Sequence, residues 1–166
     1  NSKSDLFAVF IEKCNSMTKK NRYLAMITQH AWMFLSSYEK LRSKIIQNDF
    51  ISMAHLGARA FEEIGGEVVK TTSFVLRTSD IKDYKANFVR LVDFNSQILK
   101  QEAFLAHQNM HTAIKENFSK IPGSPIAYWV SEQFLKVFGS TYTIGTQAEA
   151  KKGLTTSDDA TFLRLW

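Results

Sequence analysis

The chain has 166 residues, of which 45% are hydrophobic and 22% charged, proportions typical of a single packed domain. Lysine and arginine outnumber aspartate and glutamate by 21 − 16 = 5, which permits an anionic partner such as DNA but indicates no polybasic arm. The single cysteine, Cys14, excludes an internal disulfide framework and every multi-cysteine zinc site. Because the sequence has neither an apolar run of membrane-spanning length nor a signal-peptide pattern, we expect no membrane partner and a cytoplasmic location.

Both ends of the sequence favour a piece of a longer protein. No initiator methionine precedes Asn1, and the chain stops on the mostly apolar run Phe162–Trp166. A finished domain more often ends in polar residues. We therefore expect a fragment.

Hydrophobic periodicity predicts alternating helices and strands. Apolar residues at steps of three and four predict a helix over Ser4–Lys20, and the continuous apolar run Tyr23–Thr28 predicts a strand buried on both faces. Ser36 and Glu39 form a capping-box pattern that predicts the start of the next helix. Further strands are predicted over Phe50–Leu56, Val68–Arg77 and Asn87–Val92, and further helices over Ser96–Gln108 and Pro125–Phe138. The order predicts a parallel pair of strands joined by a crossover, with the following strand returning antiparallel.

Few residues indicate catalysis. His107 and His111 have the spacing of one helix face but no third metal ligand, so exposed helix histidines are the better interpretation. Glu62 and Glu63 lie in a glycine-containing loop, where adjacent carboxylates are usually solvated. In the same loop Phe61 stands among small and charged residues, which suits either an interaction aromatic or a packing plug. The sequence contains neither a G-x-G-x-x-G phosphate loop nor a G-x-S-x-G nucleophile motif, so a hydrolase ranks last.

Several segments resemble the gamma-type adenine-specific DNA methyltransferases. Ser4–Lys13 resembles the helix that follows the catalytic loop of that family, and Tyr23–Thr28 resembles the next strand. His55–Phe61 resembles the strand end and aromatic loop of the family, and Thr71–Arg77 resembles its antiparallel strand.

A closer resemblance is to the methyltransferases of the BREX phage-defence systems. Its most specific segments are 29–39, 56–69 and 118–129. The resemblance implies an α/β fold: the C-terminal half of a Rossmann-like methyltransferase sheet, with parallel strands plus one antiparallel strand, followed by a mostly helical linker. It also implies a division into a partial catalytic domain at 1–93, a linker with a helix at 94–124, and an amphipathic helix with the start of a target-recognition region at 125–166.

The family transfers a methyl group from S-adenosylmethionine to the exocyclic amine of an adenine that has been rotated out of the duplex. The resemblance implies that Phe61 stacks on this base and that Phe10, one turn beyond Leu6, lies against the adenine ring of the cofactor. Core packing stays open as the alternative for Phe10. Arg59 and Lys70 are expected to contact DNA phosphates, although solvated charge is an equal alternative for both.

The sequence departs from the family pattern in two places. It lacks the cofactor-binding Phe-x-Gly-x-Gly loop and the catalytic Asn-Pro-Pro-Tyr, which the resemblance places upstream of Asn1. We therefore assign no catalytic residue to this chain and expect it to be inactive in isolation.

The expected partners are double-stranded DNA and, through the family, other subunits of a phage-defence complex. If the strand Tyr23–Thr28 has an open edge, self-association through that edge is a further expectation. The alternative function is a non-catalytic interaction or DNA-recognition module. It would dock through the predicted helix Pro125–Phe138 with Tyr128, Trp129, Phe134 and Phe138.

Overall fold

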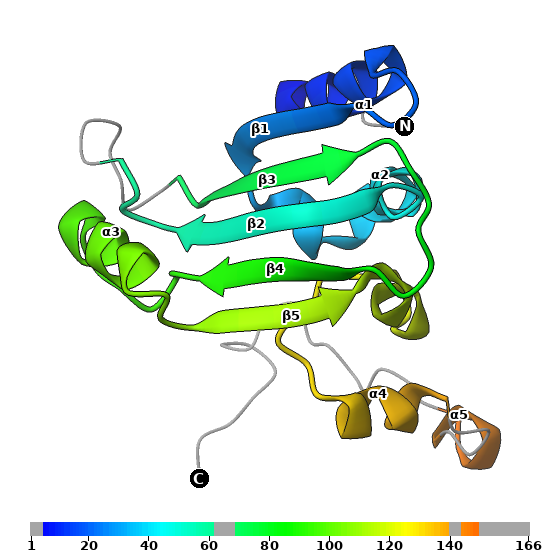
Figure 1. The fold of residues 1–166 in the computed structure, drawn as a ribbon. Helices are drawn as coiled ribbons and strands as arrows, with labels where there is room; N and C mark the ends of the chain where they lie inside the picture. Colours follow the sequence, from blue (N-terminus) through cyan, green and yellow to red (C-terminus); the bar gives the residue numbers. More distant parts are fainter. Residues whose placement is uncertain (1–4, 62–68, 140–143, 150–166) are drawn as a thin grey trace, which may run out of the picture.

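The computed structural model describes residues 5–61, 69–139 and 144–149, which form a five-stranded sheet with helices (Figure 1). The strands follow the spatial order β1-β3-β2-β4-β5. They are β1 Tyr23–Gln29, β2 Asp49–Gly57, β3 Thr71–Arg77, β4 Lys85–Arg90 and β5 Met110–Ile114. The α/β class expected from the sequence is confirmed.

Strand β3 lies between β1 and β2 and runs antiparallel to both. Strands β1 and β2 therefore point the same way without touching, as a crossover followed by an antiparallel return requires. Strand β4 pairs parallel with β2, with His55 opposite Arg90, and β5 closes the sheet antiparallel to β4. Strand β5 was not predicted from the sequence. It is the second antiparallel strand of the sheet, after β3.

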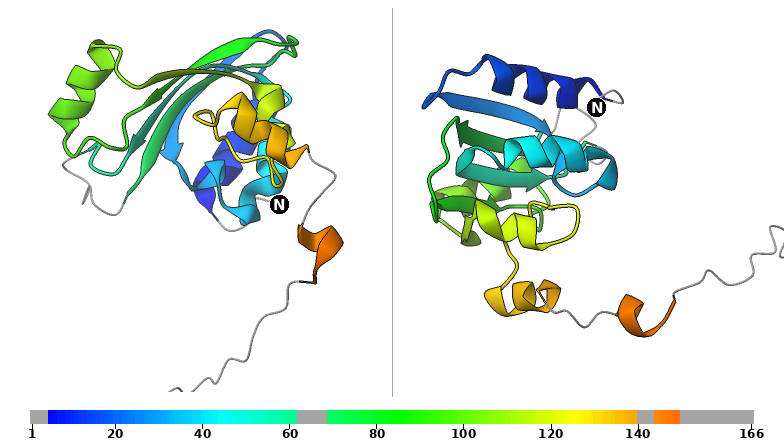
Figure 2. Two further views of the ribbon diagram at one scale, coloured as in Figure 1. Left: turned by 90° about the horizontal axis from the view of Figure 1, so that it is seen from below. Right: turned by 90° about the vertical axis from the view of Figure 1, so that its right-hand side faces the viewer.

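Helices α1 and α2 and the short 3₁₀ helices lie on one face of the sheet (Figure 2). The α-helices are α1 Leu6–Met17, α2 Glu39–Ile45, α3 Gln97–Leu105, α4 Glu132–Phe138 and α5 Ile144–Gln147, and the 3₁₀ helices are Ala31–Met33, Ser36–Tyr38 and Lys115–Lys120. Helix α3 begins where Ser96 caps it, because the Ser96 hydroxyl accepts a hydrogen bond from the Leu99 amide at 3.2 Å. Within the described residues no helix is both long and apolar enough to cross a membrane.

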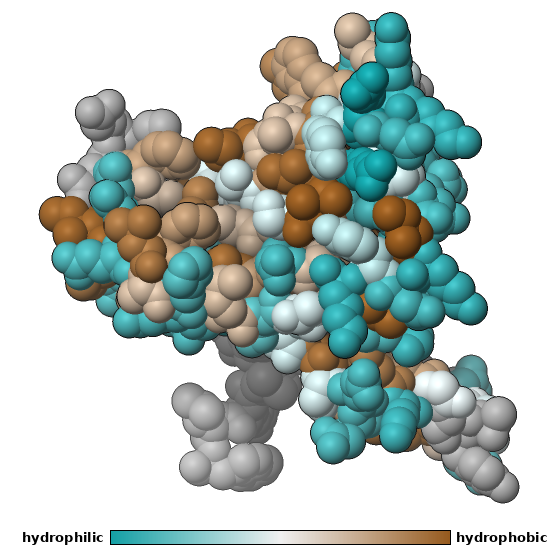
Figure 3. Space-filling view, in the orientation of Figure 1, coloured by the Kyte–Doolittle hydropathy of each residue, from teal (hydrophilic) through white to brown (hydrophobic). Residues whose placement is uncertain are grey.

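The core lies between the sheet and these helices. Phe50, Phe74 and Phe88 project from neighbouring strands and are almost fully buried. Phe118 meets both Phe50 and Phe88 edge-on, with ring centroids 5.8 and 5.9 Å apart, a favoured aromatic geometry. The opposite face, which Figure 3 shows, mixes apolar and polar residues. Asn87 lies between the buried Ala86 and Phe88, so it and its partner Ser52 point to this opposite face.

The prediction that the first strand is buried on both faces is wrong. In β1 Leu24 and Thr28 are buried, but Tyr23 and Ile27 are 62% and 59% exposed. Helix α1 covers one face of this strand, and no described element covers the other. An apolar run therefore does not by itself establish that both faces are covered.

The capping box at Ser36 and Glu39 is also wrong. Ser36 lies inside a 3₁₀ helix, and α2 begins at Glu39 after Tyr38, without a side-chain cap. Side-chain contacts stabilise this turn instead of a cap. Tyr38 is buried in the core, and the Arg42 guanidinium donates a hydrogen bond to the Leu35 carbonyl.

The helix predicted over Pro125–Phe138 exists only in its second half. It begins at Glu132, where the Ser131 hydroxyl accepts from the Phe134 amide. The preceding residues pack as an irregular segment, because the Ile126 amide donates to the Met33 carbonyl at 2.9 Å and Tyr128 stacks on Phe88. The docking helix of the alternative function therefore does not carry Tyr128 or Trp129.

The two histidines expected on one helix face are separated by the end of that helix. Helix α3 stops at Leu105, His107 and Asn109 follow with positive φ angles of 53° and 52°, and His111 lies on β5. A right-handed helix cannot continue through two residues in the left-handed conformation, whatever the apolar pattern of the sequence. Asparagine adopts that conformation more readily than most residues.

Arg42 fixes the two irregular segments that approach the end of the sheet. Arg42 is 1% exposed, and its guanidinium donates to the carbonyls of Trp32 at 2.9 Å, Leu35 at 2.6 Å and Gly123 at 2.9 and 2.6 Å. One cation thereby holds the segment after β1 against the segment before α4.

Candidate functional site

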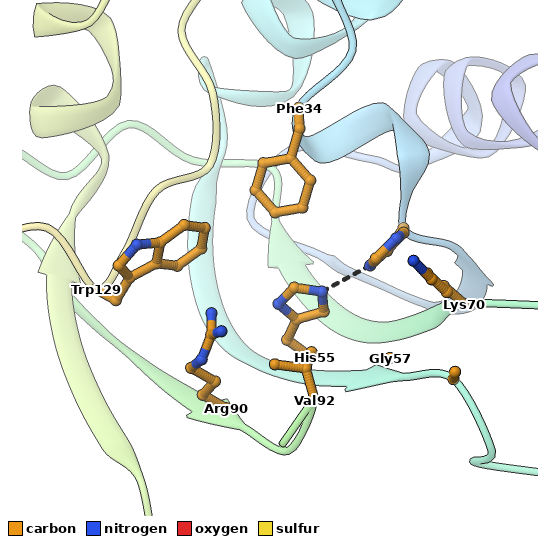
Figure 4. Close-up of a pocket in the computed structure, with 9 residues that line it drawn as sticks. Phe34, His55, Gly57, Lys70, Arg90, Val92 and Trp129 are labelled. Carbon is orange, nitrogen blue, oxygen red and sulfur yellow. Dashed lines mark hydrogen bonds between the residues drawn. The ribbon is translucent and has the colours of Figure 1, made fainter. Parts of the chain in front are cut away.

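A pocket of about 430 Å³ opens at the carboxyl ends of β1, β2 and β4 (Figure 4). Its lining residues are His30, Phe34, His55, Gly57, Ala58, Lys70, Arg90, Val92 and Trp129. Open α/β sheets bind their ligands at this edge, since loops rather than strands determine its shape. The volume is within the usual range for small-molecule sites.

The strands bring these residues together through their register. His55 and Arg90 are directly opposite in the parallel pair of β2 and β4, on the face that carries the core further along. His30 follows β1, and its amide donates to the Lys70 carbonyl at 3.0 Å just before β3. Four neighbouring strand ends thus supply the polar part of the pocket.

Gly57 ends β2 with a φ of +71°, and a Cβ there would lie 3.0 Å from the Val92 backbone. Both the left-handed conformation and this close approach require glycine. The chain turns sharply after the strand, and the turn brings Ala58 into the pocket wall.

Two aromatic side chains form one wall. The rings of Phe34 and Trp129 have centroids 5.7 Å apart at 59°, and Phe34 lies 5.7 Å from the His55 ring. The Arg90 guanidinium sits 5.2 Å from the centre of the Trp129 ring, a cation–π distance. Figure 4 shows Trp129 and Arg90 on one side of His55, Lys70 on the other, and Phe34 above the His55 ring.

The charge of the lining is positive. Lys70 and Arg90 are cationic, and none of the described residues that line the pocket carries a carboxylate. Asp93 does accept from the Arg90 Nε at 3.2 Å, but this pair is partly exposed and screened. The arrangement suits an anionic group beside an aromatic ring.

A hydrogen-bonded chain runs beneath the pocket. His30 Nδ1 lies 2.7 Å from His55 Nε2, and His55 Nδ1 lies 3.1 Å from the Tyr128 hydroxyl, which also interacts with Arg90. In its contact with Tyr128, Arg90 can only donate a hydrogen bond to the hydroxyl oxygen, so the Tyr128 hydroxyl donates its own hydrogen bond to His55 Nδ1. His55 then donates from Nε2 to His30 Nδ1. This order requires both imidazoles to be neutral.

The pKa shifts agree with neutral imidazoles. Burial, followed by the proximity of the His30 imidazole, lowers the pKa of His55 to about 3. Burial, followed by the charge of Lys70, also lowers the pKa of His30. Burial raises the pKa of Tyr128, which keeps its hydroxyl proton. The described residues contain no group of three or more histidine, cysteine or acidic side chains that could hold a metal ion.

The residues singled out in the sequence lie at three places. Lys70 lines the pocket. Arg59 and Phe61 follow β2 in the adjoining loop but are not part of the lining, and Phe61 is 36% exposed. Leu6 and Phe10 lie one turn apart on α1, outside the pocket. Glu62 and Glu63 lie outside the described residues.

Phe10 does not pack in the core that the described residues form. Ala8 and Ile11 form the buried face of α1, whereas Phe10 is 52% and Leu6 71% exposed. The two exposed side chains form an apolar surface that no described element covers.

Sequence reasoning did not predict Phe34, His55, Arg90 or Trp129 as site residues. Each comes from a different segment, and none belongs to a spaced motif. His55 and Arg90 lie at strand ends and meet through the register of β2 and β4. Phe34 and Trp129 lie in irregular segments whose place follows only from tertiary contacts.

The chain matches known methyltransferase sequences along its length. Residues 1–61 match the model of the Eco57I restriction-modification methylase family. The chain is 51% identical over 172 residues to the adenine-specific methyltransferase PglX of Lacticaseibacillus casei (strain Zhang), and 45% identical over 167 residues to the adenine-specific methyltransferase BrxX of Escherichia coli O9:H4 (strain HS). Each match covers 99% of this chain and 14% of the relative. The resemblance to adenine-specific methyltransferases is confirmed, and the chain spans about a seventh of the curated relatives it matches.

Two solved structures share the fold. The type IIG restriction endonuclease BpuSI superposes with a TM-score of 0.53 at 14% identity, over 75% of this chain and 16% of that one. A chain of a type I restriction-modification system superposes with a TM-score of 0.52 at 11% identity, over 80% of this chain and 35% of that one. At these identities the likeness concerns the fold alone.

Proposed function

We propose that this chain is a segment of a site-specific adenine DNA methyltransferase, in which it supplies part of the DNA-facing edge of the catalytic domain. The observation that carries the proposal is the 51% identity with PglX, which extends over 99% of the chain. Because the chain spans 14% of that relative, the activity is a property of a longer protein. The sequence holds no Asn-Pro-Pro-Tyr, so the groups that bind the target amine come from elsewhere in that protein.

In this proposal Phe61 stacks on the extruded adenine. The loop that carries Phe61 leaves β2 beside the pocket, at the carboxyl edge of the sheet. Its 36% exposed ring supports the interaction role over that of a packing plug. Stacking contributes about 1–3 kcal/mol per base, comparable with the cost of unstacking the base from the duplex.

Leu6 and Phe10 fit the adenine ring of S-adenosylmethionine. Their exposed side chains lie on one face of α1 and offer an apolar surface that is partly aromatic. When bound, the cofactor supplies the methyl group. The pocket beneath Phe34 is unsuited to it, because Lys70 and Arg90 would repel the sulfonium and ammonium groups.

Double-stranded DNA is the proposed partner, with phosphate contacts from Arg59 and Lys70. Arg59 follows β2 in a left-handed backbone conformation with φ 58°. The exposed Lys70 lies at the other end of the same loop. Both cations therefore flank the loop that carries Phe61. We also propose a cytoplasmic location and contact with other subunits of a phage-defence complex.

The open edge of β1 suggests where another chain or segment pairs. Among the described residues β1 pairs with β3 alone. Unpaired backbone groups along an apolar strand are a template for a further strand. We propose that a strand of the longer protein, or a second copy of this chain, pairs there.

A segment exchange tests the proposed function. The corresponding segment of the Lacticaseibacillus casei PglX is replaced by this chain in the gene of its own host, so that any further subunits are present. N6-methyladenine is then mapped across the genome, with the unchanged gene and a deletion as controls. We expect the chimera to retain methylation. If the chimera accumulates to the level of the unchanged protein and the genome of its host nevertheless contains no N6-methyladenine, the proposal is contradicted.

A further inference from the structure

We infer that the pocket formed by Phe34, Trp129, Arg90 and Lys70 binds a second nucleotide of the DNA strand, distinct from the one that Phe61 stacks. The inference rests on the proposed function for the identity of the polymer. It concerns a different aromatic surface, since Phe61 is not among the residues that line the pocket, and Lys70 is common to both proposals.

The wall is suited to a base. Phe34 and Trp129 contact each other at an angle, so together they form one aromatic surface rather than a slot. Trp129 is 39% exposed, although its neighbour Tyr128 is buried. A base laid on this surface gains stacking whatever its hydrogen-bonding pattern.

The two cations are suited to the phosphate of the same nucleotide. Arg90 is held by its cation–π contact with Trp129 and by its contacts with Asp93 and Tyr128, so its position is fixed before a ligand arrives. Lys70 is exposed and lies on the other side of His55 (Figure 4). Because the described lining residues include two cations and no carboxylate, this part of the pocket favours an anion over a cation.

The separation of the two sites fits a single strand. Gly57 lines the pocket, and Phe61 follows four residues later, which limits the distance between their Cα atoms to roughly 14 Å. Stacked nucleotides rise about 3.4 Å per step, so this distance is within a few nucleotides. One strand can therefore reach both aromatic groups.

The binding of short oligonucleotides to the 166-residue chain tests the inference. The probe is a fluorescein-labelled deoxyadenosine tetranucleotide, and its dissociation constant is measured by anisotropy at several salt concentrations. We expect Trp129→Leu to weaken binding about tenfold and Trp129→Phe about twofold, because a ring remains in the second variant. We expect Lys70→Ala to weaken binding and to lower the salt slope by about 0.7, the value for one phosphate contact on a single strand.

Three comparisons complete the test. Lys85→Ala removes an equal charge at the other end of β4 and should leave the dissociation constant unchanged. An abasic tetranucleotide should bind at least about tenfold more weakly than the probe, since it has no base to stack. Melting temperatures confirm that each variant is folded. Equal binding by the abasic probe, or a dissociation constant for folded Trp129→Leu within twofold of the unchanged chain, would overturn the inference.

The failure of this inference differs from that of the proposed function. Tetranucleotide binding to the 166-residue chain reports on the pocket, whereas methylation by the chimera reports on the proposed function. If Trp129→Leu has no effect while the chimera methylates DNA, the second subsite alone is wrong. If Trp129→Leu weakens binding while the chimera is inactive, the methyltransferase assignment alone is wrong.

Discussion

Phe61→Ala in the PglX chimera is expected to lower the rate of methylation roughly 5- to 150-fold, because a methyl group cannot replace the stacking of about 1–3 kcal/mol that the ring gives an extruded base. Phe61→Trp is expected to retain most of the rate, since an indole also presents an aromatic face. The rates are measured with labelled S-adenosylmethionine and duplex DNA at saturating cofactor.

The melting temperatures of the two variants separate stacking from packing. If Phe61 were a packing plug, tryptophan would overpack the loop and destabilise the protein, and alanine would be the milder change. A rate for Phe61→Ala equal to that of the unchanged chimera would end the stacking proposal. So would a Phe61→Trp protein that has lost both stability and activity while Phe61→Ala keeps both.

Arg42→Met is expected to lower the free energy of unfolding by about 3–5 kcal/mol, because it leaves three buried carbonyl groups without their donor. Those carbonyls belong to Trp32, Leu35 and Gly123. The corresponding fall in melting temperature is roughly 10 °C for a chain of this size. Urea unfolding of the 166-residue chain measures the effect.

Lys40→Met on the same helix is the matched control. Lys40 is exposed, so the same replacement there should change the unfolding free energy by less than about 0.5 kcal/mol. Equal effects of the two substitutions on the free energy of unfolding would show that Arg42 does not join the segment after β1 to the segment before α4. Loss of tetranucleotide binding in Arg42→Met while the chain is still folded would extend its role to the pocket.

The strands that form from local signals could be predicted. The sequence indicated β1, β2, β3 and β4 to within a few residues, because each contains a run of β-branched or apolar residues bounded by polar ones. The antiparallel return of β3 followed from chain order. Strand β5 has no such run, and it forms because its backbone pairs with β4.

Tertiary contacts account for the main errors. Residues 125–131 have helical periodicity, yet Tyr128 gains more by stacking on Phe88, with centroids 4.8 Å apart and rings at 5°. Likewise, the apolar run of β1 says nothing about whether a layer covers its second face, and Tyr23 remains exposed. Periodicity predicts which side chains share a face, but the neighbouring elements decide which face is buried.

The candidate site was predictable only in part. Phe61, Arg59 and Lys70 stand in one loop and could be singled out from a segment of sequence. Phe34, His55 and Trp129 are distant in the chain and meet only because β2, β4 and the segment held by Arg42 converge. Such a site has no linear motif, so it requires the register of the sheet.

Photochemical cross-linking to the target position tests the central claim, that the loop at the carboxyl edge of the sheet receives the extruded base. The methylome of the chimera gives its recognition sequence, and a duplex with 5-iodouracil in place of the target adenine is irradiated in complex with the protein. Peptide mapping is expected to find the attachment in the tryptic peptide 60–70, which contains Phe61, and Phe61→Ala is expected to abolish it. Attachment to α3 or to the exposed face of β1, or an unchanged yield with Phe61→Ala, would contradict the account.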